Sequence, residues 1–283
     1  MSNPRETEDS QSTIEFQSSL DRRSFLKRAT IVGATSILGL GALLNGFPAN
    51  AAEEEKTKTV RVKKRDKDIL IAAQIAEALA VTTYSNIINT SPFFTRIPSD
   101  DQGYLQAALQ EEMSHYALEK SVSGEDSPFT TFFYPANMFT DAQTTLNVLV
   151  TLEDAFIAAY LVGVRDFSTA DLRVTAARIM GIESDHRTLA RVVGPDVAAM
   201  DGGPIENITG VQGTSESVDP PNNNGYERTL SWTTISQAVT ALTPFVSMSA
   251  ASTAGFDTTK SFAFVPFTPT LPSTLGEFIS FTG

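Results

Sequence analysis

The chain contains two histidines, and each follows a glutamate by three residues: Glu112 precedes His115, and Glu183 precedes His186. Residues three positions apart share one face of an α-helix, so each pair can direct a carboxylate and an imidazole at one point. Oxygen and imidazole ligands together suit iron, manganese or zinc. The two pairs therefore indicate a metal site built by two helices.

Composition excludes several other classes of site and partner. The 283 residues include no cysteine, which rules out disulfides, thiolate metal ligands and thiol nucleophiles. The net charge of -12 argues against nucleic acid and anionic membrane surfaces as partners. With 41% hydrophobic residues, the chain can bury one sizeable core and still carry an extension.

Residues 1–51 have the pattern of an export signal. Arg22 and Arg23 begin a twin-arginine core, an apolar stretch runs from Ala29 to Phe47, and Ala49-Asn50-Ala51 is a small-x-small cleavage site. The stretch contains several glycines and is short for a membrane span, so we favour cleavage over an uncleaved anchor. We expect the twin-arginine translocase to export the folded protein to the periplasm or outside the cell. Contact with the membrane would then arise only through an uncleaved leader.

The mature chain is predicted to be a helical bundle with a charged tether before it. Residues 52–67 form the tether, residues 68–195 the bundle, and residues 196–283 a C-terminal extension. Four amphipathic segments with helix-boundary signals fill the bundle, at about 68–89, 100–124, 141–167 and 168–194. The extension contains a loop over residues 200–225, a fifth helix over about 229–246, and strands or a wrapping tail after residue 250.

Connection lengths predict how the four helices are joined. Short links join the first helix to the second and the third to the fourth, so each pair should form an antiparallel hairpin. Residues 122–139 are longer and carry several aromatic residues. Eighteen extended residues reach roughly 60 Å, which is enough to cross a bundle of about 30 Å.

The other two predicted helices each carry a glutamate among apolar residues, Glu77 and Glu153. Burying such a carboxylate without a partner would cost several kcal/mol, and a divalent cation would supply the partner. Tyr84 follows Glu77, and Tyr160 follows Glu153, by two helical turns in each case. For the tyrosines, a role beside the metal ligands and a place in the core as ordinary aromatic residues both stay open.

Acidic residues near the histidines are further candidates for orienting the imidazoles. Asp185 and Glu111 are sequence neighbours of the two pairs, and Glu119 lies one turn after His115. Positions adjacent on a helix face away from the ligand stripe, so we favour solvated surface charges for all three. Asp185 is retained as a candidate.

This arrangement resembles the ferritin-like superfamily, in which two helices each give one glutamate and two others each give Glu-x-x-His. The resemblance implies an all-α bundle of two antiparallel hairpins with one long crossover. It also implies that Glu112 and Glu183 bridge two divalent metals. Glu77 with His115 would complete one metal, and Glu153 with His186 the other. Export and a long tail also resemble the desiccation- and stress-related members.

The resemblance implies redox chemistry on Fe(II) and dioxygen, or on peroxide, in oxidative or desiccation stress. Two metals are expected, with iron favoured over manganese, and a manganese site would suit peroxide disproportionation. A homo-oligomer is compatible with the sequence. A second function stays open, namely a protective or binding module whose metal site is structural or weakly active. Metal identity, substrate and the role of residues 200–283 are open at this point.

Overall fold

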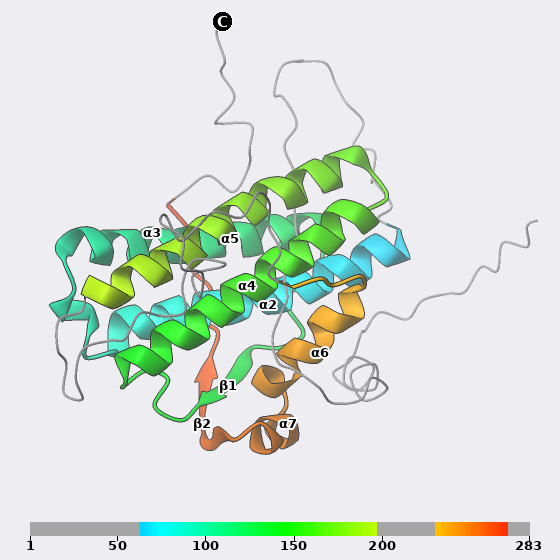
Figure 1. The fold of residues 1–283 in the computed structure, drawn as a ribbon. Coiled ribbons are helices and arrows are strands. Elements are labelled where there is room, and N and C mark those ends of the chain that lie inside the picture. The colour runs from blue at the N-terminus through cyan, green and yellow to red at the C-terminus, as the bar shows by residue number, and fades with distance from the viewer. Residues whose placement is uncertain (1–62, 197–229, 271–283) are drawn as a thin grey trace, which may run out of the picture.

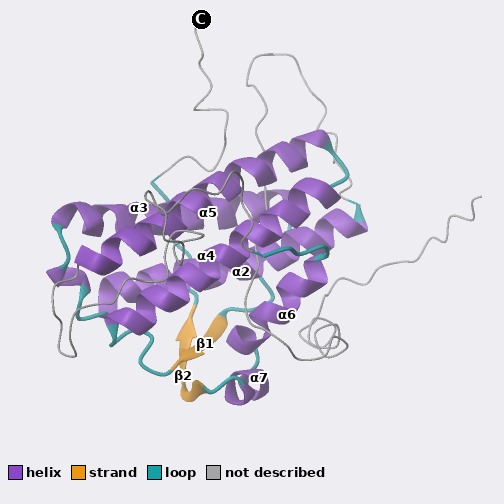
Figure 2. Cartoon of the chain, in the orientation of Figure 1, coloured by secondary structure: helices purple, strands orange, loops and turns teal. Residues whose placement is uncertain are grey.

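The computed structural model describes residues 63–196 and 230–270. The predicted leader, the predicted loop over residues 200–225 and the end of the tail lie outside these ranges. Within them the fold is a helical bundle with a small sheet and two further helices beside it (Figure 1, Figure 2).

The bundle consists of α2 (Lys64–Thr90), α3 (Ser99–Ser123), α4 (Ala142–Asp166) and α5 (Ala170–Asp196). Helix α2 packs along α3, and α4 packs along α5. A short link containing the 3-10 turn η1 (Phe94–Arg96) joins the first pair. The predicted pair of hairpins with one long crossover is therefore confirmed.

Helix α2 begins at Lys64, four residues before residue 68, at which the sequence predicts the bundle to start. The reason is Asp66, whose side chain is buried and whose carboxylate accepts hydrogen bonds from the backbone N–H of Ser168, at 2.9 Å, and from its hydroxyl. Ser168 lies in the link between α4 and α5. This contact ties the first turn of α2 to the second hairpin, and residues 64–67 belong to the bundle.

The crossover between α3 and α4 contains a strand, β1 (Thr131–Pro135). It pairs antiparallel with β2 (Phe256–Ala263) in the C-terminal extension, with Phe132 opposite Phe262 and Tyr134 opposite Asp257. The expected strand after residue 250 is thus present, and its partner is the aromatic crossover. The extension is attached to the bundle through this sheet.

The fifth helix is α6 (Ile235–Val246), and a short α7 (Met248–Thr253) follows it. Helix α6 starts later than residue 229 because Thr234 is its N-cap, and the side chain of Gln237 accepts from the backbone N–H of Thr234 at 3.0 Å. A capping box of this kind satisfies the free N–H groups of the first turn.

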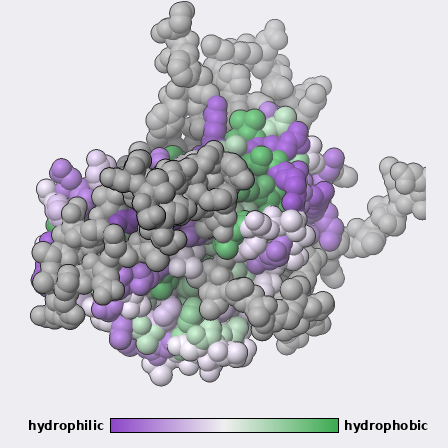
Figure 3. Space-filling model, in the orientation of Figure 1, coloured by the Kyte–Doolittle hydropathy of each residue, from purple (hydrophilic) through white to green (hydrophobic). Residues whose placement is uncertain are grey.

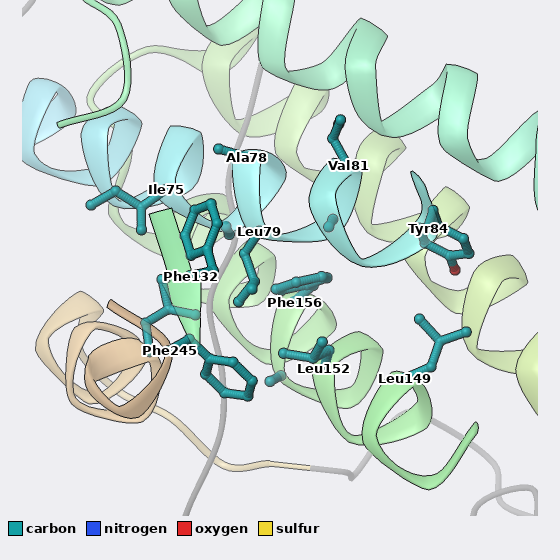
Figure 4. Packing of buried hydrophobic residues seen from close by; sticks show 14 of the residues in the cluster. Ile75, Ala78, Leu79, Val81, Tyr84, Phe132, Leu149, Leu152, Phe156 and Phe245 are labelled. Carbon is teal, nitrogen blue, oxygen red and sulfur yellow. The ribbon is translucent and has the colours of Figure 1, made fainter. Parts of the chain in front are cut away.

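Apolar side chains of α2, α4, β1 and α6 form one core. Phe132 and Phe245 lie beside Leu79 and Leu152, so the crossover and the extension cover one side of the bundle (Figure 4). On the face shown in Figure 3, hydrophilic and apolar side chains are mixed over the described residues. Helix α4 is apolar and long enough to span a membrane, but most of it is buried against its neighbours. Its hydropathy is that of a core helix.

Candidate metal centre

All six predicted ligands come together inside the bundle. Each of the four helices contributes, and every one of the six side chains is buried. Helix α2 supplies Glu77, α3 supplies Glu112 and His115, α4 supplies Glu153, and α5 supplies Glu183 and His186.

The six side chains form two overlapping groups with the spacing of metal ligands. One consists of Glu77, Glu112, His115 and Glu183, and the other of Glu112, Glu153, Glu183 and His186. Within each group, one candidate atom from every residue lies within 4.8 Å of the others. Glu112 and Glu183 belong to both groups, so two ions placed here would share these carboxylates.

The histidines face the shared carboxylates through their Nδ1 atoms. Nδ1 of His115 lies 3.2 Å from Glu183 and 3.7 Å from both Glu77 and Glu112. Nδ1 of His186 lies 2.9 Å from Glu112 and 3.4 Å from Glu183. Each imidazole therefore presents the same ring nitrogen to the centre of its group.

The two tyrosines connect the halves of the site crosswise. The hydroxyl of Tyr84 donates to Glu153 at 2.7 Å, and the hydroxyl of Tyr160 donates to Glu77. Each tyrosine thus binds the glutamate of the other half, and each leaves one oxygen of that glutamate for another partner. A donor held in this way fixes the orientation of the carboxylate.

The site brings several buried acids close together, and this raises the pKa values of Glu77 and Glu153. Burial, together with the charge of Glu112, raises the pKa of Glu77 to about 8. Burial and the charges of Glu112 and Glu183 also raise the pKa of Glu153 well above its usual range. These carboxyls resist ionisation until a cation offsets their charge.

The histidines respond in the opposite sense. Burial alone would lower the pKa of His115, but its contacts with Glu112, Glu183 and Glu77 raise that pKa well above its usual value. Glu112 and Glu111 do the same for the pKa of His186. When no metal is bound, the raised pKa values therefore favour the protonated forms of both imidazoles and of Glu77 and Glu153.

Glu111 orients His186, which corrects one sequence-based prediction. The side chain of Asp185 is exposed, so it does not orient a ligand. Nε2 of His186 instead lies 2.8 Å from a carboxylate oxygen of Glu111, across the bundle on α3. A neutral His186 protonated at Nε2 would donate to Glu111 and leave Nδ1 free for a metal. This contact could not be predicted from neighbouring positions in the sequence, because Glu111 lies on α3 and His186 lies on α5.

Glu119 is the second correction, since it is not a solvated surface charge. Its side chain is 0% exposed, and neither carboxylate oxygen has a hydrogen-bond partner among the described residues. Burial and the charges of Glu77, Glu183 and Glu112 raise its pKa well above the usual range. The sequence did indicate this position, because Glu119 lies one helical turn after His115 and therefore on the face of α3 that carries the ligands.

A family model for the ferritin-like domain matches residues 65–194. Residues 65–194 form a ferritin-like domain. The match covers α2 to α5 almost completely and stops before α6 and β2. No curated protein and no solved structure matches the chain.

The ferritin-like domain therefore contains all six predicted ligands and both tyrosines. Its buried glutamates and histidines are compatible with a carboxylate site that holds metal ions. None of the residues in the two groups comes from residues 230–270, the described part of the C-terminal extension. This part packs on the domain through the sheet and α6.

Proposed function

We propose that the ferritin-like domain binds two divalent metal ions, iron or manganese with iron favoured, and uses them in redox chemistry on dioxygen or peroxide. The observation that carries the proposal is the sharing of Glu112 and Glu183 by both groups of candidate ligands. A shared pair of carboxylates, with one further glutamate and one histidine for each ion, is the ligand pattern of a dinuclear site.

The residues present fit two such ions. Several buried atoms at the centre have no hydrogen-bond partner among the described residues, namely Oε2 of Glu77, Glu112 and Glu153, both oxygens of Glu183, and Nδ1 of His115. Buried polar atoms are normally paired, so these atoms need a partner of another kind. Four carboxylates also balance the charge of two divalent cations. Hard, oxygen-rich sites of this composition suit Fe(II) and Mn(II).

When bound, the metal pair would give electrons to dioxygen or peroxide and, in peroxide disproportionation, would take electrons back from a second peroxide molecule. The protein itself holds the ligands in place through the hydroxyls of Tyr84 and Tyr160 and the carboxylate of Glu111. Because all six ligands are buried, we expect only small molecules such as dioxygen or peroxide to reach the centre. Glu111, whose side chain is 34% exposed, connects His186 to the surface and can exchange protons with solvent.

Metal analysis of the protein isolated from its native host tests the proposal. We expect close to two iron or manganese ions per chain, and a content near zero would contradict it. Fe(II)-dependent oxygen uptake would indicate oxidation of Fe(II), and oxygen evolution from peroxide would indicate catalase-type chemistry. Bound metal without turnover in either assay would instead favour a protective module with a structural site.

Export and a role in stress defence are part of the same proposal. The twin-arginine motif supports export, because that pathway carries proteins that have already folded around a cofactor. Loading metal before export would suit a site as buried as this one. Fractionation of native cells tests this part, and recovery of the full-length protein only in the cytoplasm would contradict it.

Replacing His186 with alanine should remove one metal ion and leave the other. His186 belongs to only one of the two groups, whereas the Glu77–His115 group keeps all its members. Metal content should fall from about two to about one per chain, and activity should be lost, with helical circular dichroism retained. His115→Ala is the matched variant and should also retain one ion. Loss of both ions in both variants would show that the two positions fill only together.

A further inference from the structure

Glu119 is a buried carboxylate that the six-ligand site leaves unexplained. Its side chain is 0% exposed, and both carboxylate oxygens lack a hydrogen-bond partner among the described residues. Leaving a charged or polar group unpaired in the interior is strongly unfavourable. The four carboxylates of the two groups already balance two divalent ions, so Glu119 adds a fifth acid.

The position of Glu119 directs it toward one half of the site. It lies on α3, one turn after His115 and two turns after Glu112, and so on the same face of the helix. Among the neighbouring charges, that of Glu77 acts on it most strongly, and Glu119 in turn acts on Tyr160, which donates to Glu77. Glu119 therefore lies on the side of Glu77.

A second buried oxygen without a partner lies at the same end of the site. Gln74 is one turn before Glu77 on α2, and its Nε2 donates at 3.0 Å to the hydroxyl of Ser123, one turn after Glu119. This contact places Gln74 and Glu119 at neighbouring levels of α2 and α3. Oε1 of Gln74 has no partner among the described residues. Oε1 of Gln74 and the carboxylate of Glu119 are thus buried acceptors without donors, on neighbouring turns of the two helices that carry Glu77 and His115.

The other half of the site has no equivalent of Glu119. The position two turns after Glu183 on α5 is Ala190, which is also buried. In that half, Glu111 lies beside His186. Glu111 directly precedes Glu112, and the equivalent position before Glu183 is the apolar Ile182. The two metal positions therefore differ at two places although their six ligands are related by a repeat.

We propose that Glu119 is a further metal ligand, specific to the ion held by Glu77 and His115, so that the two metal positions are unequal. This inference rests on the proposed function, because it requires the dinuclear site. Glu119 is in neither group of atoms within 4.8 Å of one another, so its side chain must rotate toward Glu77 to reach that ion. A carboxylate held there offers a hard divalent cation one more oxygen ligand.

Stepwise binding of Mn²⁺ to the metal-free protein tests the inference. Calorimetric titration and electron paramagnetic resonance should show that Glu119→Gln weakens one of the two ions about tenfold or more and leaves the other unchanged. In a His186→Ala background, Glu119→Gln should weaken the single remaining ion. In a His115→Ala background it should have no effect. Wild-type binding constants for both ions in Glu119→Gln would overturn the inference.

Thermal melts test whether Glu119 binds an ion or is only a buried acid without a partner. Glu119→Gln removes a buried carboxyl, so the metal-free variant should melt at the wild-type temperature or above. The rise in melting temperature on adding Mn²⁺ should be smaller than in the wild type. An equal rise in both proteins would show that Glu119 binds no ion.

Glu111→Gln is the matched control, because it removes the other acid that distinguishes the halves. It should weaken the ion at His186 and spare the ion at His115. The same titrations test the dinuclear site and the role of Glu119 independently. A wild-type protein that binds no Mn²⁺ contradicts the dinuclear site itself, whereas two tight ions that Glu119→Gln does not affect contradict the role of Glu119 alone.

Discussion

Replacing Glu183 with alanine should remove both metal ions, the largest effect expected of any single substitution in the site. Glu183 belongs to both groups of candidate ligands, and both of its oxygens lie buried without a hydrogen-bond partner among the described residues. Its loss takes one carboxylate from each ion and leaves three of the four carboxylates in the two groups. Metal content should fall from about two ions per chain to near zero, with activity lost.

The substitution should leave the bundle folded, because it removes a buried acid whose two oxygens have no hydrogen-bond partner among the described residues. Helical circular dichroism checks this, and Glu183→Gln gives a variant of equal size if alanine leaves too large a cavity. Asp185→Ala is the matched control, since Asp185 is exposed on the same helix two residues away. It should keep both ions. Two ions bound to Glu183→Ala would contradict the shared-carboxylate geometry.

The metal-free protein should lose stability as pH rises from about 5 to 8, and bound metal should abolish this loss. The pKa of Glu77 is about 8 in the folded protein, against an ordinary value of 4.5. Between these values the folded state holds a proton that the unfolded state has released. Stability therefore falls with rising pH, by up to about 1.4 kcal/mol per pH unit for each such group.

The histidines shift stability in the same direction. The pKa values of His115 and His186 are raised well above the ordinary 6.5, so their stabilising contribution is full below that pH and declines as pH rises through the raised pKa. Metal displaces these protons and supplies the positive charge that they provided, so metal affinity should increase with pH.

Thermal melts in chelator and in excess Mn²⁺, across this pH range, measure both effects. The two melting curves should diverge as pH rises. Glu77→Gln serves as the control, because it removes one titrating group and should flatten part of the pH dependence of the metal-free protein. A melting temperature of the metal-free protein that is independent of pH would contradict the coupled protonation described above.

Most of the domain could be predicted from residue types and spacing. Helix boundaries follow from local signals such as the Ser91-Pro92 stop after α2 and the glycine at position 124, which has a positive φ that ends α3. Those signals act over a few residues, and so they are visible in the sequence. The spacing of Glu112 and His115, and of Glu183 and His186, likewise depends only on helix periodicity.

Contacts between helices could not be predicted in the same way. The pairing of Tyr84 with Glu153, and of Tyr160 with Glu77, depends on α2 and α4 lying side by side, and the sequence alone left two interpretations of these tyrosines open. Asp185, a candidate for orienting His186, is exposed, as expected for a residue next to a ligand on the same helix, because adjacent helical positions face different directions. The residue that contacts His186 is Glu111 of α3.

The sequence by itself determined four helices, their order and six candidate ligands, because each of these depends on periodicity within one helix. Only the tertiary structure decided that the six ligands form two groups sharing Glu112 and Glu183. It also decided that Glu119 is buried and that β1 receives a strand from the extension. These features depend on which helix faces meet across the bundle, and such contacts join residues far apart in the chain.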